Sequence, residues 1–161
     1  KKAYLEDLSG WYSSADAGYI DEEGYIWVMS RTDDIINCAG HRLSTGAMEE
    51  VLSKHEDIAE CAVVGIDDEL KGQVPMGFIV INTGTSKANN IIIDETINSV
   101  RNEIGPVASF RKVVIVNRLP KTRSGKILRS TIAAIVDKKT YKIPATIDDE
   151  TILDEIKEAI N

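Results

Sequence analysis

The sequence has 161 residues, of which 43% are hydrophobic and 28% are charged, and its formal net charge is −7 at pH 7. This length and composition fit one globular domain with a sizeable core and exclude a disordered chain. No apolar stretch approaches the roughly 18 residues of a membrane span, and an acidic chain does not suit nucleic acid. We therefore expect neither a membrane nor a nucleic acid as a partner.

The start of the chain and its cysteines indicate its processing and its compartment. The chain begins at Lys1 without an initiator Met or a leader pattern, so we expect a processed protein or a fragment. Cys38 and Cys61 lie among apolar neighbours and lack Cys-x-x-Cys spacing. Such cysteines indicate reduced core thiols in the cytoplasm, and we expect neither a disulfide nor a metal site.

The charge is unevenly distributed along the chain. Residues 111–142 contain ten Lys and Arg against one acid, Asp137. A local basic segment can receive a small polyanion such as ATP or coenzyme A, although on charge alone a solvated basic face is favoured.

The hydrophobic pattern alternates between the spacing of strands and that of helices. In chain order it predicts a strand over 25–29, a hairpin over 35–43, a helix from 44 or 45, strands over 61–66 and 77–81, a helix from 94, a strand over 113–116, a helix from 126 and a short acidic helix over 149–160. Strands alternating with helices predict an α+β fold, in which helices pack on a small mixed or antiparallel sheet.

Asp16 and Arg31 carry the first chemical signal. An acid before a strand, with an Arg just after it, can hold a ribose, because a carboxylate accepts hydrogen bonds from two vicinal hydroxyls at once. Asp33 and Asp34 follow directly. Each of these acids is also consistent with an ordinary turn cap.

The second signal is the segment 37–44, Asn-Cys-Ala-Gly-His-Arg-Leu-Ser. Gly40 permits a tight turn or the close approach of a ligand, and Arg42 can hold a phosphate with its forked donors. An ordinary hairpin with Arg42 in a surface ion pair explains the same residues.

The third signal is the segment 119–127, Leu-Pro-Lys-Thr-Arg-Ser-Gly-Lys-Ile. It carries Lys126 to a helix start, where its cation can face an anionic reaction centre. It is not a phosphate-binding P-loop, because Pro120 and Ile127 break that pattern. A flexible basic loop before an amphipathic helix is the alternative.

The three segments, in this order, resemble the C-terminal signature of the adenylate-forming enzymes, which include acyl-CoA synthetases, luciferases and peptide-synthetase adenylation domains. Asp16 stands at the acid of the Thr/Ser-Gly-Asp motif. Three further segments resemble motifs of the family. Residues 30–34 resemble Gly-Arg-x-Asp-Asp, residues 37–42 resemble Asn-x-x-Gly-His-Arg, and residues 120–126 resemble Pro-Lys-Thr-x-Ser-Gly-Lys. Segments 71–73, 104–108 and 141–149 are most similar to propionyl-CoA synthetases. The departures from the motifs, Ala15, Ser30 and Ala39, are small residues.

The resemblance implies a domain division and an activity. Residues 1–32 would end an N-terminal adenylation domain, and residues 33–161 would form the C-terminal domain with the Lys126 loop and a tail. The implied enzyme is an AMP-forming propionate–CoA ligase that uses ATP and coenzyme A, with Mg²⁺ held mainly by the N-terminal domain. This chain alone would be inactive. The alternatives are an acetate–CoA ligase, a carrier-protein-dependent adenylation domain and a non-catalytic nucleotide-binding module.

The resemblance also implies residue roles and partners. The implied roles are catalysis for Lys126, ribose binding for Asp16 and Arg31, ATP-phosphate binding for Arg42, a hinge at Asp33, pantetheine contact for Gly40 and 3′-phosphate binding for Arg101. A snorkelling surface arginine is the alternative for Arg101. The implied partners are small-molecule substrates, the N-terminal domain of the same protein, and a lysine acyltransferase and deacylase acting on Lys126.

Overall fold

The computed structural model describes residues 10–12 and 14–160. Its elements are β1 (Asp16–Ile20), β2 (Ile26–Arg31), η1 (Thr32–Asp34), β3 (Ile35–Cys38), β4 (His41–Ser44), α2 (Thr45–Ser53), β5 (Ile58–Asp68), β6 (Gly72–Ile81), α3 (Asn89–Glu103), η2 (Pro106–Ala108), β7 (Lys112–Ile115), α4 (Arg129–Val136) and α5 (Ile152–Ile160). No helix in this part of the chain is long and apolar enough to cross a membrane.

Five of the strands form one mixed sheet. β5 pairs antiparallel with β6 along almost its whole length. On the other edge of β6, β3 pairs antiparallel at one end and β7 pairs parallel further along. The α+β prediction is confirmed.

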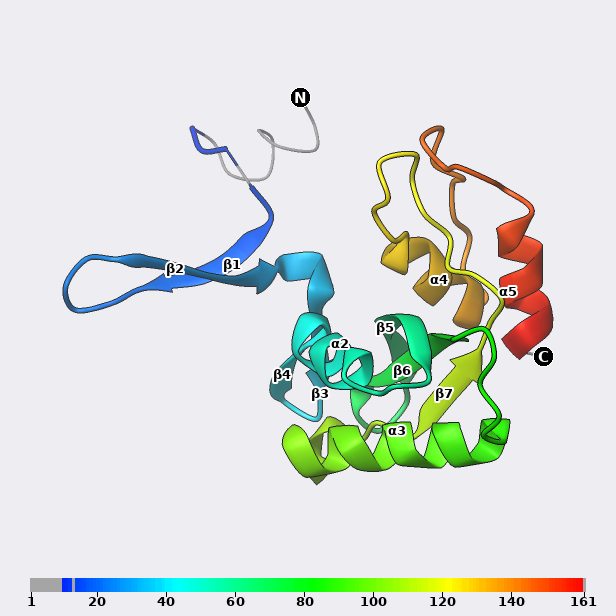
Figure 1. The fold of residues 1–161 in the computed structure, drawn as a ribbon. Coiled ribbons are helices and arrows are strands. Elements are labelled where there is room, and N and C mark those ends of the chain that lie inside the picture. The colour runs from blue at the N-terminus through cyan, green and yellow to red at the C-terminus, as the bar shows by residue number, and fades with distance from the viewer. Residues whose placement is uncertain (1–9, 13, 161) are drawn as a thin grey trace.

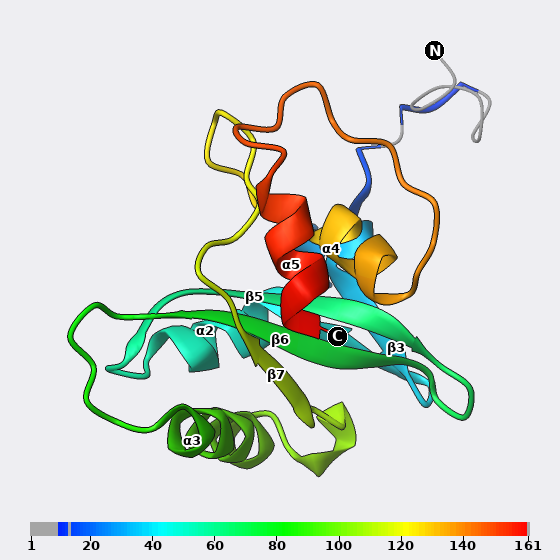
Figure 2. The same cartoon turned by 90° about the vertical axis from the view of Figure 1, so that its right-hand side faces the viewer.

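Helices cover both faces of this sheet (Figure 2). The core on one face is formed with α2 and α3, and the core on the other face with α4 and α5. Because side chains alternate along a strand, β5 sends Val63 to the first core and Ala62 and Val64 to the second. Burial on both faces explains why this strand is a continuous apolar run.

β1 and β2 form a separate antiparallel ribbon that projects from the body (Figure 1). We call this ribbon the arm. Tyr19 and Trp27 stack on it, yet their exposed fractions are 53% and 52%. Ile20 and Val28 are still more exposed. Neither core contains a described residue that precedes Ile36, so the described part of the arm adds nothing to the hydrophobic cores, and η1 links it in sequence to the body.

The helix boundaries differ from the predicted ones. α3 begins at Asn89 instead of 94, because Ala88 is extended and the run of three isoleucines at 91–93, which lacks helical spacing, forms the first turns. α4 begins at Arg129 instead of 126, because the preceding segment closes on itself. α5 begins at Ile152, after a turn in which Asp149 accepts hydrogen bonds from Thr151.

β1 is a strand that the pattern missed. Its sequence, Asp-Ala-Gly-Tyr-Ile, contains residues of low strand propensity, and the register shifts between Ala17 and Gly18. Pairing with β2 determines its conformation.

Candidate functional site

Lys126 lies in a closed hairpin. The Thr122 N–H donates to the Lys126 carbonyl at 2.8 Å, and the Gly125 N–H donates to the Thr122 carbonyl at 2.8 Å. Gly125 has φ +83°, which glycine adopts without strain. The loop, residues 120–128, is therefore an ordered turn, which we call the Lys126 hairpin. The Lys126 side chain is exposed, and its ammonium has no ion pair with any described residue.

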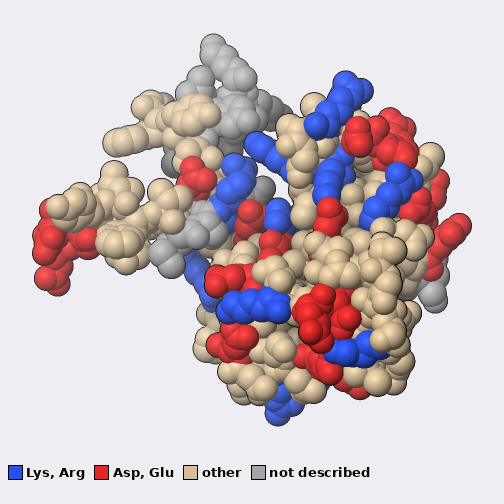
Figure 3. Space-filling model, viewed as in Figure 1, with Lys and Arg blue, Asp and Glu red and all other residues tan. Residues whose placement is uncertain are grey.

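Lys126 and Arg31 line the same groove. Its volume is about 600 Å³, and its lining also includes Asp34 and Arg129. Asp16 is paired with Arg31 across the arm, so the two predicted ribose contacts are neighbours. Figure 3 shows basic side chains between the arm and the upper part of the body. The structure thus brings Asp16 and Arg31 close to the Lys126 hairpin.

Arg129, which also lines the groove, is held by an acid that the sequence reading missed. Its Nε and Nη2 donate to the two oxygens of Glu49 at 2.8 and 2.7 Å. Glu49 also accepts the Val63 N–H at 2.8 Å. The hydrogen bonds to Glu49 raise the pKa of Arg129. Because the two residues are 80 positions apart, no local pattern could have identified the pair.

Gly40 and Arg42 lie at the β3–β4 turn, as predicted. Ala39 and Gly40 both have positive φ, at 50° and 84°, and the Ala39 N–H donates to the Lys71 carbonyl at 2.8 Å. A Cβ at Gly40 would meet open space, so the surrounding chain leaves room for a side chain. Glycine is favoured at this position because φ is positive. Arg42 is exposed and makes no ion pair within the described ranges. Neither residue lines the Lys126 groove.

Arg101 and Asp33 occupy two other places. Arg101 is exposed on α3 and lines a cavity of about 140 Å³ with Ser109, Phe110 and Arg111. This cavity is on the α3 side of the sheet, whereas the helix that follows the Lys126 hairpin packs on the other face (Figure 2). Asp33 is the central residue of η1, the short turn between the arm and β3.

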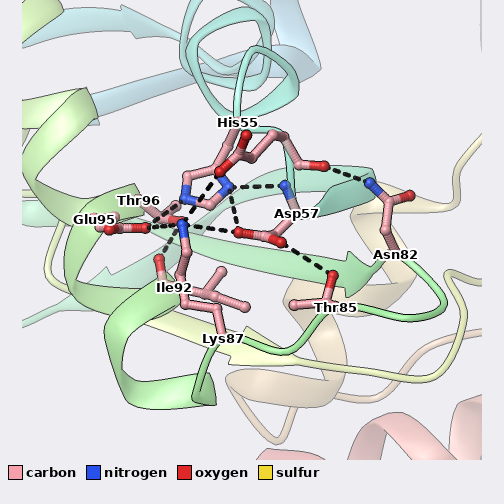
Figure 4. Close-up of polar contacts among 9 residues, drawn as sticks. His55, Asp57, Asn82, Thr85, Lys87, Ile92, Glu95 and Thr96 are labelled. Carbon is pink, nitrogen blue, oxygen red and sulfur yellow. Dashed lines mark hydrogen bonds and ion pairs between the residues drawn. The ribbon is translucent and has the colours of Figure 1, made fainter.

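A charged cluster around His55 was not predicted (Figure 4). Ligand atoms of His55, Asp57 and Glu95 lie within 4.8 Å of one another, a spacing that could hold a metal ion. The Lys87 ammonium, however, lies 2.9 Å from both Asp57 Oδ2 and Glu95 Oε2 and supplies the positive charge there. It lowers the pKa of both carboxyls, and they raise the pKa of Lys87. The cluster ties α3 to the start of β5.

Both cysteines are free thiols. Cys38 is buried and Cys61 is half-buried. Burial raises the pKa of the Cys61 thiol to about 11, so this thiol is protonated and unreactive at neutral pH.

Comparison with known proteins places these features in a family. The AMP-binding enzyme C-terminal domain matches residues 47–126. The chain is 52% identical over 156 residues to the acyl-CoA synthetase short-chain family member B, mitochondrial, of Dictyostelium discoideum, covering 97% of this chain and 23% of that protein. It is 39% identical over 158 residues to an acetyl-coenzyme A synthetase of Pyrobaculum aerophilum, covering 98% of this chain and 23% of that protein. The chain spans about a quarter of the length of these relatives.

A solved structure has the same fold as this chain. An amide bond synthetase from Marinactinospora thermotolerans superposes with a TM-score of 0.65 at 26% identity, over 83% of this chain and 26% of that one. The family match, the relatives and the fold agree with one another. The chain therefore belongs to the AMP-binding enzyme C-terminal domain family, within the adenylate-forming superfamily.

Proposed function

We propose that this chain is the C-terminal domain of an AMP-forming short-chain acyl-CoA synthetase, and that propionate is its acid. The enzyme would join the acid to ATP with release of pyrophosphate, and the thiol of coenzyme A would then displace AMP from the acyl-adenylate. The observation that carries this proposal is the exposed Lys126 ammonium at the edge of a groove that it shares with Arg31.

Lys126 would act in the first half-reaction. Its ammonium would lie against the α-phosphate and the attacking carboxylate and would offset the negative charge that grows in the transition state. Arg129 is less available for this task because Glu49 already accepts two of its hydrogen bonds. Asp16 and Arg31 would hold the ribose, and Arg42 would hold the phosphates of ATP.

Gly40 and Arg101 would serve the second half-reaction. Gly40 would lie beside the pantetheine arm of coenzyme A, and Arg101 would contact its 3′-phosphate. Neither residue lines the Lys126 groove. This separation supports a rotation of the domain about Asp33 between the half-reactions, since presenting different residues to one active site requires different orientations.

The arm supports the proposed domain division at residues 32 and 33. Its apolar side chains are exposed in the described part of the chain, and a surface of this kind marks a contact with another domain. A preceding N-terminal domain of the same protein would cover it and supply the acyl pocket.

Mg²⁺ would be held mainly by that N-terminal domain. The described lining of the Lys126 groove sets three basic side chains, Arg31, Lys126 and Arg129, beside one carboxylate, Asp34, and this positive charge disfavours a cation there. We assign no step on this chain to the ion. The exposed Lys126 would also be the substrate of a lysine acyltransferase and deacylase, and the two free thiols support a reducing compartment such as the cytoplasm.

The choice of propionate rests on the similarity of segments 71–73, 104–108 and 141–149 to propionyl-CoA synthetases. The identity to the acyl-CoA synthetase short-chain family member supports a short-chain acid as the substrate. The test is kcat/KM for acetate, propionate and butyrate, measured with the protein that carries the preceding domain. We expect propionate to have the highest value. A preference for acetate would refute the choice of acid, and transfer to a carrier protein but not to coenzyme A would refute the ligase.

A further inference from the structure

The C-terminal tail pairs with the Lys126 hairpin. Thr122 and Ile147 form an antiparallel bridge, in which the Arg123 N–H donates to the Thr146 carbonyl and the Asp148 N–H donates to the Lys121 carbonyl, both at 2.9 Å. The bridge between Lys121 and Ile127 closes the hairpin itself. The tail therefore adds a third strand-like segment to the hairpin that carries Lys126.

Arg118 joins the same tail to the chain just before the hairpin. Its guanidinium donates to Asp149 Oδ2 at 2.6 Å, to Glu155 Oε1 at 2.6 Å and to Thr151 Oγ1 at 3.0 Å. The Asp149 pKa is lowered to about 2, chiefly by the hydrogen bonds from Thr151 and then by Arg118. A forked guanidinium that contacts three side chains has a more defined geometry than a single surface ion pair.

The other end of the tail is anchored in a core. Ile147 is 5% exposed, and Ile152, Leu153 and Ile156 of α5 are buried beside α4 on the same face of the sheet. The hairpin is thus connected through the tail to the rigid part of the domain. The family match ends at residue 126, before the tail begins.

We propose that residues 144–156, which we call the tail brace, fix the orientation of the Lys126 hairpin, with Arg118, Ile147 and Asp148 as positioning residues. The importance of that orientation rests on the proposed function, because only a catalytic Lys126 needs a fixed direction. Without the brace the hairpin would keep its internal turn but would move relative to α4. The Lys126 ammonium would then face the reaction centre for a smaller fraction of the time. The brace would therefore support the half-reaction that uses Lys126 and leave the other unaffected.

The first test measures the brace in the chain itself. Asp148→Pro removes the N–H that donates to the Lys121 carbonyl, whereas Asp148→Ala keeps that N–H and removes only the carboxylate. Amide hydrogen exchange is followed at Arg123, which bonds to the tail, and at Phe78, which lies buried in β6. We expect Asp148→Pro to speed amide exchange at Arg123 about tenfold, which is the factor that corresponds to roughly one lost hydrogen bond. Exchange at Phe78 should not change in this variant. In Asp148→Ala, both amides should exchange at the rates of the parent.

Two outcomes would overturn the proposal. Equal exchange at Arg123 in the two variants would show that the tail does not restrain the hairpin. A parallel rise at Arg123 and Phe78 would show that the substitution weakens the whole fold instead of a local contact.

The second test uses the protein that carries the preceding domain. Adenylate formation is measured by pyrophosphate exchange, and thioester formation is measured from supplied acyl-adenylate. We expect Asp148→Pro to lower the first rate about tenfold more than the second, and Asp148→Ala to leave their ratio at the parental value. Equal loss of both rates would reject the brace as a positioning device. If the parent shows neither rate, the proposed function fails, while the exchange experiment still decides whether the brace exists.

Discussion

At the scale of single residues, Lys126 combines an ordered backbone with an exposed side chain. Its backbone is fixed by hydrogen bonds within the hairpin, yet its ammonium is exposed and unpaired among the described residues. Lys54, by contrast, pairs with Glu103, and Lys121 pairs with Glu60. An unpaired cation carried by an ordered backbone is suited to a reaction centre in which negative charge develops.

The first prediction concerns this charge. In the protein with the preceding domain, Lys126→Ala should lower adenylate formation by roughly 100- to 1,000-fold, the value of one well-placed charge, and should spare thioester formation from supplied acyl-adenylate. Acylation of Lys126 should act in the same way, because it removes the charge. Lys112→Ala, which removes an exposed lysine on β7, is the control and should change neither rate. Equal loss in both half-reactions would contradict the division of roles.

Asp33 is the subject of the second prediction. It lies in the only turn that connects the arm to the body within the described ranges, so the direction of the arm depends on its φ and ψ. Asp33→Pro fixes φ near −65° and disfavours the helical conformation of Thr32 before it. We expect adenylate formation to persist and thioester formation to collapse, measured by pyrophosphate exchange and single-turnover assays. Parallel changes in both would remove Asp33 from the hinge role.

At the scale of elements, the described part of the arm stands apart from the two hydrophobic cores of the body. Both cores are made of residues from Ile36 onward in the described part of the chain. A shortened chain that begins at residue 33 should therefore unfold at the same temperature as the whole chain, within about 2 °C. Thermal unfolding followed by circular dichroism is the measurement. A clear fall in the midpoint would mean that the arm belongs to the folded body, and that the division at 32 and 33 is misplaced.

The attachment of α3 to the sheet depends on pH through the Lys87 cluster. Asp57 and Glu95 have pKa values below their ordinary 3.8 and 4.5, mainly because of Lys87. Carboxyls with a lowered folded pKa contribute stability above their unfolded pKa and lose it as the pH falls through the folded pKa. Lys87→Met should thus lower the unfolding midpoint at pH 7, and its difference from the parent should shrink below about pH 4.

The matched control for this prediction is Lys54→Met. Lys54 also bridges to α3, through Glu103, but its side chain is 56% exposed against 28% for Lys87. An ion pair between exposed groups contributes little, so this variant should change the midpoint less than Lys87→Met at pH 7. A Lys87→Met effect that stays constant from pH 7 to pH 3 would show that packing, and not charge, explains it.

At the scale of the whole molecule, this chain contains only part of the proposed active site. Lys126 and Arg31 line one groove, and Asp16 is paired with Arg31 across the arm, while the acyl pocket would come from a preceding domain. We therefore expect no acyl-CoA from ATP, propionate and coenzyme A with the 161-residue chain alone. A coupled assay for AMP release measures this. Turnover by this chain, at a rate above that of Lys126→Ala, would show that a second domain is not needed.

Local patterns in the sequence determined most of the secondary structure, with β1 as an exception, and the identity of the motifs. The spacing of Met48, Val51, Leu52 and His55 predicted α2, although the helix ends at Ser53 and His55 instead contacts Glu95. Ala39-Gly40 predicted the β3–β4 turn, because positive φ is a local property of these two residues. The start of α3 was misplaced, since an isoleucine run is equally compatible with a strand and a helix.

Only the tertiary structure decided what holds the site in place. The Arg129–Glu49 pair spans 80 positions, the Arg118–Glu155 pair spans 37, and the Lys87 cluster joins residues from separate elements. Likewise, the resemblance named Lys126 and Arg31, but only the folded chain showed that they line one groove and that Arg101 lies elsewhere. The physical reason is that hydrogen bonds and ion pairs depend on distances below about 4 Å. Those distances are set by the packing of the whole chain and leave no periodic trace in the sequence.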